Sequence, residues 1–193
     1  MVKMIITDHK AIEWVEDSSN FFRGWFFNEN GFYKDKEALF FLNSIHNNNF
    51  NNKLKSINGN FSCIVTDNDT TYVAVDRIRS FPLFYTKFNS EVYISDSIEE
   101  LKRVIGDVKI EIGHLQELMA TGYVTGSKTI YKNIYQVQAG EYLTIDNRTG
   151  NIERCNYYLH THKNSYNKSI KELCKELDTV LINVFNRLIE SVE

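Results

Sequence analysis

Short runs of aromatic and β-branched residues, each closed by turn-forming residues, limit the fold of this chain more than any other feature of its sequence. Residues 4–7, 11–15 and 21–27 form such runs near the start, and residues 129–137 and 141–145 form them again much later. This pattern is typical of β-strands. We therefore expect sheet at both ends of the first domain.

The middle of this domain combines a hairpin with further strands. Residues 61–65 and 71–75 flank a turn at 67–69, which predicts a β-hairpin. Two more strands are expected at 83–87 and 91–94.

Helical spacing occurs between these strands. Apolar residues three and four positions apart predict a helix over 35–47, and residues 112–120, followed by Gly122, predict another. Asp96 and Glu99 have the spacing of a capping box ahead of a third helix. With a turn expected at 57–60, the order of elements predicts an α+β fold with two layers of antiparallel sheet covered by helices.

Composition and charge exclude several classes of protein. The 193 residues carry a formal net charge of -3 and contain no Lys/Arg cluster, so duplex nucleic acid and anionic membrane are not expected partners. No apolar run approaches the roughly 20 residues of a membrane span. Three cysteines without a C-x-x-C spacing predict neither a disulfide framework nor a zinc site, which favours a cytoplasmic protein.

The last part of the chain follows a different pattern. Residues 160–168 are polar, and the apolar positions that follow predict one long amphipathic helix over 169–192. Its apolar stripe is wider than packing against one sheet requires, so we expect this helix to have a partner.

Four segments of the chain resemble, in the same order, motifs of a known family. Residues 57–67 (INGNFSCIVTD) resemble its strand L-x-G-x-F-A-x-x-x-x-D, and residues 75–85 (VDRIRSFPLFY) resemble R-D-x-x-G-x-x-P-L-Y. Residues 93–101 follow where the family has F-A-S-E-x-K-A-L, and residues 129–143 match T-x-F-x-x-I-x-x-L-x-P-G-x-x-L. From about residue 20 onward the chain thus resembles the N-terminal glutaminase domain of glutamine-dependent asparagine synthetases, class II amidotransferases of the N-terminal-nucleophile hydrolase fold.

The resemblance implies a more detailed architecture. It implies an αββα sandwich like that of N-terminal-nucleophile hydrolases, made of two stacked, mainly antiparallel sheets flanked by helices and followed by a long C-terminal helix. The glutaminase-like domain would span residues 1–158, and residues 159–193 would be a linker and the first helix of a truncated synthetase domain.

The same resemblance shows that the glutamine site is altered. The family's nucleophile is the Cys after the initiator Met, and this chain has Val2 there, which offers no group for an α-amine to activate. Arg23 replaces the Asn of the oxyanion-hole motif N-G-E-x-Y-N, of which Gly24 and Asn28 remain.

Four later positions complete this vestigial site. Asp76 keeps the Asp of R-D-x-x-G, whereas Arg79 replaces its Gly, and Ser95 and Asp96 stand for the S-E pair. The resemblance therefore assigns no catalytic residue and no metal ligand to this chain. Independently of the family, an Asp directly after a strand, as Asp76 is, should accept backbone N–H bonds from the turn that follows.

These positions favour an N-terminal part of an asparagine-synthetase-like ATP-dependent amide ligase, with a degenerate glutaminase domain acting as scaffold. ATP and Mg²⁺ would bind only in a missing C-terminal synthetase domain, because no Gly-Gly pair for its S-G-G-x-D-S loop occurs here. That domain, or a second copy, would cover the 169–192 helix. The alternatives are a stand-alone binding or assembly module, and an active glutaminase that supplies ammonia for asparagine synthesis.

A few other residues have a functional and a structural interpretation. The alternation around Cys63 favours a buried core residue over a nucleophile, and Cys174 is expected on the apolar face of its helix. Arg77 and Arg79 are either solvated or line an anion pocket. Thr7 would become an N-terminal nucleophile only after a cleavage that nothing in the sequence favours.

Overall fold

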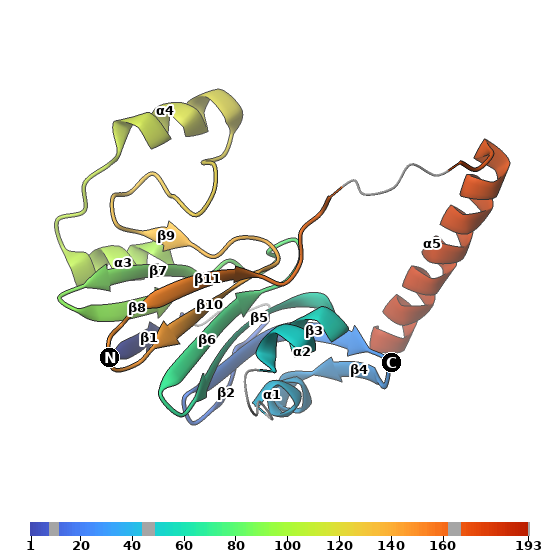
Figure 1. The fold of residues 1–193 in the computed structure, drawn as a ribbon, viewed down its shortest axis with the longest axis horizontal. Coiled ribbons are helices and arrows are strands. Elements are labelled where there is room, and N and C mark those ends of the chain that lie inside the picture. The colour runs from blue at the N-terminus through green and yellow to red at the C-terminus, as the bar shows by residue number, and fades with distance from the viewer. Residues whose placement is uncertain (8–11, 44–48, 162–166, 193) are drawn as a thin grey trace. The chain divides into compact units, whose positions relative to one another are not determined.

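The computed structural model describes residues 1–7, 12–43, 49–161 and 167–192 of the chain (Figure 1). These residues fall into two compact units, Met1–Leu159 and His160–Glu193. The first unit contains all the strands of the described chain and helices α1 to α4, and the second contains helix α5.

The larger of two sheets has seven strands and is antiparallel throughout. Along its main path the order is β11-β10-β6-β5-β3-β2, and β4 also pairs with β3. The strands are β2 (Val15–Asp17), β3 (Asn20–Asn28), β4 (Gly31–Lys34), β5 (Asn58–Asp67), β6 (Thr70–Val75), β10 (Glu141–Asp146) and β11 (Ile152–Asn156).

The smaller sheet has four strands in the order β1-β8-β7-β9. Its strands are β1 (Val2–Ile5), β7 (Phe84–Phe88), β8 (Glu91–Ser95) and β9 (Tyr135–Gln136). The pair β1–β8 is parallel, with Val2 opposite Val92 and Ile5 opposite Ser95, whereas β7 pairs antiparallel with both of its neighbours.

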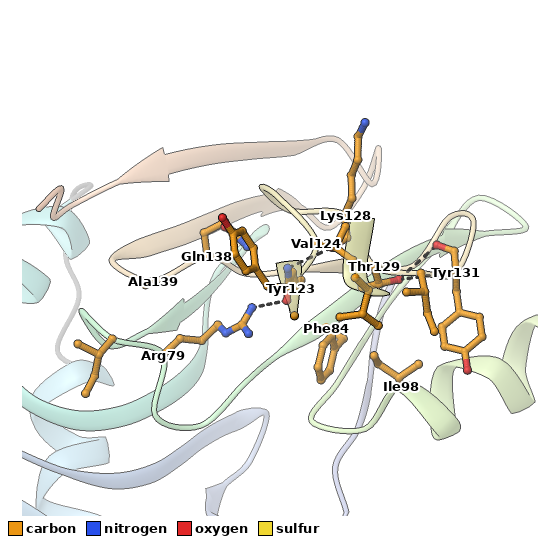
Figure 2. A pocket seen from close by; sticks show the side chains of 15 residues that line it. Arg79, Phe84, Ile98, Tyr123, Val124, Lys128, Thr129, Tyr131, Gln138 and Ala139 are labelled. Carbon is orange, nitrogen blue, oxygen red and sulfur yellow. Dashed lines mark hydrogen bonds between the residues drawn. The ribbon is translucent and has the colours of Figure 1, made fainter. Parts of the chain in front are cut away.

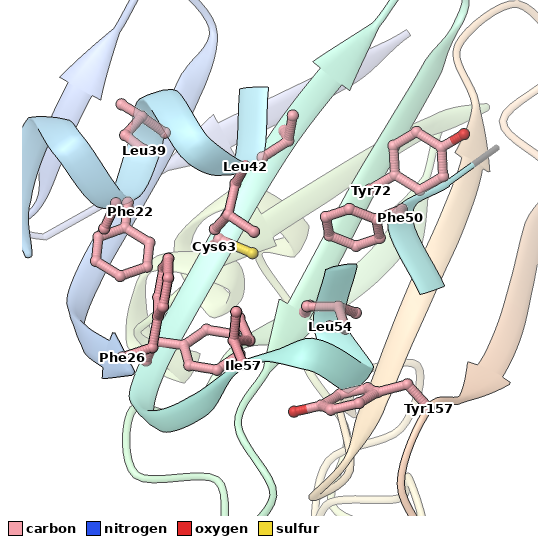
Figure 3. Close-up of a cluster of buried hydrophobic side chains, with 14 residues drawn as sticks. Phe22, Phe26, Leu39, Leu42, Phe50, Leu54, Ile57, Cys63, Tyr72 and Tyr157 are labelled. Carbon is pink, nitrogen blue, oxygen red and sulfur yellow. The ribbon is translucent and has the colours of Figure 1, made fainter. Parts of the chain in front are cut away.

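Two apolar clusters hold the layers together. The first joins helices α1 (Asp35–Asn43) and α2 (Phe50–Ser56) to the larger sheet (Figure 3). Its largest buried side chains are Phe22, Phe26, Phe50, Phe61, Leu39, Leu42, Leu54 and Ile57. The second cluster lies between the sheets, because it combines Ile64, Val73 and Leu143 of the larger sheet with Val92 and Ile94 of β8.

Helix α3 (Ile98–Ile105) packs on β7 and β8 through the buried Leu101. The predicted α+β fold of two stacked, mainly antiparallel sheets flanked by helices and followed by a C-terminal helix is therefore confirmed. Helix α4 (Ile112–Thr121) has no buried residue and ends at Gly122 in the left-handed conformation, as predicted.

Several elements differ from the sequence-based predictions. Helix α2 was not expected, and the turn predicted at 57–60 is wrong because β5 already begins at Asn58. Gly59 has no left-handed backbone; it is needed because an added Cβ would lie 2.3 Å from the Trp25 carbonyl oxygen. Of the strand predicted at 129–137, β9 contains only two residues.

Two predicted boundaries near the start of the chain also change. The predicted strand 11–15 overlaps the observed β2 only at Val15, and residue 11 lies outside the described residues. The helix predicted over 35–47 is observed as α1 to Asn43, and residues 44–47 are likewise outside the described part.

Helix α5 (Ile170–Val192) has 23 residues and forms most of the second unit. Its described side chains are all exposed, including Leu177, Leu181 and Phe185, and Cys174 is exposed with them. In the described part of the chain, no helix is long and apolar enough to cross a membrane.

Candidate functional site

A buried carboxylate lies where the smaller sheet meets the start of the larger one. Asp96 follows β8, and 2% of its side chain is exposed. It accepts hydrogen bonds from the Thr7 backbone N–H at 2.9 Å, the Thr7 hydroxyl at 3.0 Å and the Trp14 indole N–H at 2.9 Å. These groups and Arg23, whose Nη1 lies 3.7 Å from Asp96 Oδ2, form what we call the Asp96 cluster.

The capping box predicted from Asp96 and Glu99 does not form. Ser97 is the N-cap residue of α3 and makes no side-chain cap hydrogen bond. Three N–H and O–H donors and a guanidinium stabilise a buried carboxylate more than an exposed helix end does. Asp96 therefore bonds to these tertiary partners and does not cap α3.

Arg23 projects from β3 between aromatic side chains. Its guanidinium carbon lies 4.9 Å from the centre of the Phe81 ring and 5.9 Å from that of Trp14. Only 11% of the side chain is exposed, and its Nε has no hydrogen-bond partner among the described residues. Burial lowers the pKa of Arg23, and the Asp96 carboxylate opposes this shift. The contacts show a cation packed against rings and paired with one carboxylate.

Ser95 ties the end of β1 to the end of β8. Its hydroxyl donates to the Ile5 carbonyl oxygen at 2.5 Å and accepts the Ser97 N–H at 3.0 Å. The two bonds fix the backbone on both sides of Asp96, and the one hydrogen of the hydroxyl is donated to the scaffold.

Gly24 allows the close approach of two strands beside Arg23. Its φ of +101° favours glycine, and an added Cβ would lie 2.0 Å from the Asn60 carbonyl oxygen and 2.7 Å from the Phe81 ring. Asn28 lies at the other end of β3, opposite Gly31, where its side chain accepts the Asn30 N–H at 2.7 Å. The structure therefore separates Asn28 from Arg23 and Gly24.

Asp76 forms a second, independent centre. The carboxylate is fully buried and accepts the backbone N–H groups of Phe61 at 3.1 Å, Ile78 at 2.8 Å and Ser80 at 2.9 Å. This confirms the predicted turn chemistry and explains why an acidic residue is buried there.

The two arginines of this turn point to different places. Arg77 donates to the carbonyl oxygens of Lys55 and Ile57 and lies over the Tyr158 ring. Arg79 has a left-handed φ of +59° and donates from Nη1 to Gln136 Oε1. Arg77 and Arg79 therefore do not line one pocket together.

Val2 lies apart from the other predicted site positions. It pairs with Val92 at the start of β1 and packs against the cluster between the sheets, whereas the Asp96 cluster adjoins the other end of the strand. A cavity of about 610 Å³ adjoins that end and is lined by Thr7, Trp14 and Phe21, among others. Thr7 and Trp14 were not predicted as members of the cluster. The sequence did offer one indication, because the indole N–H of a tryptophan such as Trp14 needs a hydrogen-bond acceptor when it is buried.

Cys63 offers no nucleophile to this cluster. Cys63 is fully buried in the helix-facing core, and burial raises the pKa of its thiol to about 12. This confirms its interpretation as a core residue. Over the described ranges there is no group of three or more His, Cys, Asp or Glu side chains placed to hold a metal ion. His160 and His162 have a His-x-His spacing that could bind a metal, but His162 lies outside the described residues.

The chain matches the family model described as the glutamine amidotransferase domain over residues 34–158. Most of the chain lies within this match, and the protein belongs to that family. No curated protein sequence matches it.

Two solved structures are similar in fold. One is glutamine phosphoribosylpyrophosphate amidotransferase from B. subtilis complexed with ADP and GMP, with 13% identity and a TM-score of 0.43. The other is described as the allosteric regulatory enzyme of purine biosynthesis, with 11% identity and a TM-score of 0.39. The likeness covers 76% of this chain and 31% of each of theirs, so this chain spans about a third of their length.

Proposed function

We propose that this chain is the N-terminal part of an asparagine-synthetase-like, ATP-dependent amide ligase, and that its glutamine amidotransferase domain is a scaffold without glutaminase activity. The observation that carries the proposal is the chemistry of the positions that the motif resemblance assigns to the glutamine site. Val2 supplies only methyl groups at the nucleophile position, and Arg23 supplies a paired cation in place of a neutral amide donor.

The contacts of these residues support a structural role. Asp96 uses its carboxylate to join the N-terminal segment to β3, and Ser95 uses its hydroxyl to join β1 to α3. Asp76 is buried under the turn that it organises. Asp76, Ser95 and Asp96 are thus each engaged in holding two segments of the chain together.

The remaining chemistry would lie in other parts of the ligase. ATP and Mg²⁺ would bind in a C-terminal synthetase domain, which we propose also packs against helix α5. We propose a cytoplasmic location for the ligase, with no nucleic-acid or membrane partner. A free amine would then replace ammonia released from glutamine.

A glutaminase assay tests this proposal directly. The purified chain is incubated with 10 mM glutamine, and glutamate release is followed with a coupled dehydrogenase, with an active class II amidotransferase as the positive control. We expect no release above buffer. Release that is proportional to the chain and is abolished in Thr7→Ala, which removes the hydroxyl of the Asp96 cluster, would overturn the proposal and favour an active glutaminase that supplies ammonia.

A second candidate is a stand-alone binding or assembly module. The exposed apolar side chains of α5, among them Leu177 and Phe185, favour it because they need a cover in water. The mass of the natural protein, together with a search of its sequence for an S-G-G-x-D-S segment, distinguishes the two. A natural protein of 22.6 kDa without that segment would favour the module.

A further inference from the structure

A second cavity, of about 620 Å³, lies at the edge of the smaller sheet and shares no residue with the Asp96 cluster. Its walls come from the 76–80 turn, β7, α3, α4 and the segment 122–139 (Figure 2). The volume is in the range of small-molecule sites, roughly 300 to 1,000 Å³. Apolar side chains form much of the lining, including Phe84, Ile98, Leu118 and Val124.

The cavity contains a cation that is not neutralised. Its lining includes Arg79 and Lys128 and has no acidic residue, and across the described chain no ion pair involves Arg79. Arg79 is half-buried, and burial lowers the pKa of its guanidinium. In Figure 2 the Arg79 side chain points toward the middle of the lining residues, whereas Lys128 extends away from them.

The guanidinium is held in place by a neutral group. Arg79 Nη1 donates to Gln136 Oε1, and Gln136 Nε2 donates to the carbonyl oxygens of Gly126 at 3.0 Å and Lys128 at 3.1 Å. These two bonds fix the orientation of the amide, so that its oxygen faces the arginine. The arginine is therefore positioned without loss of its charge.

The backbone of Arg79 is strained in a way that its neighbours maintain. A non-glycine residue in the left-handed region is disfavoured because its Cβ lies too close to the following carbonyl oxygen. Asp76 holds the turn through the N–H groups of Ile78 and Ser80, and the Arg79 N–H donates to the Asp76 carbonyl oxygen at 3.2 Å. A strained residue that directs an unneutralised charge into an apolar cavity is typical of a binding site.

The opposite wall is fixed to the domain at several points. The His114 Nδ1 lies 2.9 Å from the Thr129 carbonyl oxygen, and the Thr129 hydroxyl donates to the Ile134 carbonyl oxygen at 2.8 Å. The Glu111 N–H donates to the Ile130 carbonyl oxygen at 2.9 Å. These bonds hold α4 and the segment after it beside the cavity, although α4 itself has no buried side chain.

We propose that this cavity binds a carboxylate carried by an apolar or aromatic group, with Arg79 as the residue that binds the anion. The carboxylate would receive the charge-assisted hydrogen bonds that Gln136 leaves available on the guanidinium, and the apolar group would lie against Phe84, Ile98 and Val124. A blocked hydrophobic amino acid and the C-terminal residue of a peptide share this chemistry.

Titration calorimetry with matched acids and amides tests the proposal. N-acetyl-phenylalanine and the peptide Ala-Ala-Ala-Phe are each compared with their C-terminal amides. We expect at least one acid to bind, and its amide to bind about tenfold or more weakly, a difference of about 1.4 kcal/mol. The arm that binds identifies whether a small acid or a peptide end is the better ligand.

Two charge-removing variants locate the binding group. Arg79→Gln should weaken the acid about tenfold or more and leave the amide unchanged, whereas Lys128→Gln, the matched control, should leave both unchanged. Thermal unfolding of each variant verifies that it is folded. If neither acid binds at 10 mM, if acid and amide bind equally, or if Lys128→Gln has the larger effect, the proposal is wrong.

Discussion

Replacing Asp76 is the most informative perturbation of the fold, because one buried carboxylate holds three backbone N–H groups. In Asp76→Ala all three donors lose their acceptor. In Asp76→Asn the amide oxygen can take the place of Oδ2, which accepts from Phe61 and Ser80, but the amide NH₂ then faces the Ile78 N–H. The two variants therefore differ in the number of bonds lost.

The expected magnitude follows from the burial of each donor. The bond to the Phe61 N–H is buried, and its loss costs about 1 to 3 kcal/mol. The bonds to Ile78 and Ser80 are partly buried, so water can replace the carboxylate and each loss costs about 0.5 to 1.5 kcal/mol. We expect the free energy of unfolding to fall by about 2 to 6 kcal/mol in Asp76→Ala, which loses all three bonds, and by about 0.5 to 1.5 kcal/mol in Asp76→Asn, which loses the bond to Ile78.

Urea unfolding followed by circular dichroism measures both changes. The matched control is Asp146→Ala, since the Asp146 carboxylate also accepts two turn N–H groups, from Arg148 at 2.9 Å and Thr149 at 2.8 Å, but in an exposed turn. Its loss of stability should be clearly smaller. A loss in Asp76→Ala no greater than in this control, at unchanged m-value, would refute the argument from burial.

Further predictions concern reactivity, the pH dependence of stability, packing and association. Cys63 should resist alkylation at pH 8 while Cys174 reacts, as mass spectrometry can show. Because the pKa of Cys63 rises from 9.0 to about 12 on folding, the unfolded thiol loses its proton first, and stability should fall between about pH 9 and pH 12 in urea titrations. Gly24→Ala should destabilise the fold by about 3 kcal/mol or more by urea unfolding, whereas Gly113→Ala, whose added Cβ meets no atom within 4 Å, should not destabilise it. The chain should self-associate through α5, since a large apolar side chain left exposed forgoes roughly 1.5 to 3 kcal/mol of burial free energy. Light scattering should show an average mass that rises with protein concentration and is lower in Leu181→Glu. A strictly monomeric wild type would contradict this prediction.

Local chemistry made part of the fold predictable. The hairpin of β5 and β6 follows from alternating residues around a polar turn, and it forms as predicted, with Ser62 opposite Val75 and Asp67 opposite Thr70. The Asp76 turn was predictable because its donors lie within the turn or on the strand next to it. In both cases the decisive contacts are close in sequence or follow from strand alternation.

Long-range contacts decided the elements that the sequence did not predict. Asp96 does not cap α3 as predicted, because it accepts hydrogen bonds from Thr7 and Trp14, which lie more than eighty positions earlier in the sequence. The segment 129–137 looks like a strand by composition, but the Thr129 hydroxyl bonds to the Ile134 carbonyl oxygen and closes a loop instead. Propensity over a short window contains no information on either partner.

Of the Asp96 cluster, the sequence singled out Arg23 and Asp96 but not Thr7 or Trp14, and it did not show how the predicted positions are grouped. Arg23 and Asp96 do meet, whereas Val2, Asn28 and Asp76 lie in different places. The cavity around Arg79 depends on Gln136, which no motif singled out. Such groupings arise only when two sheets and their connecting loops have been placed.

The parallel pairing of β1 with β8 determines how long β1 stays without its strand partner during synthesis. Val2 pairs with Val92, so β1 must wait for a partner encoded ninety positions later. At about 5 to 20 residues per second, this wait is about 5 to 20 s on the ribosome. The nascent β1 is an unpaired strand throughout that interval, and Asp96 reaches Thr7 only at its end. A chaperone that shields strand edges would thus find its binding segment in β1 during that interval.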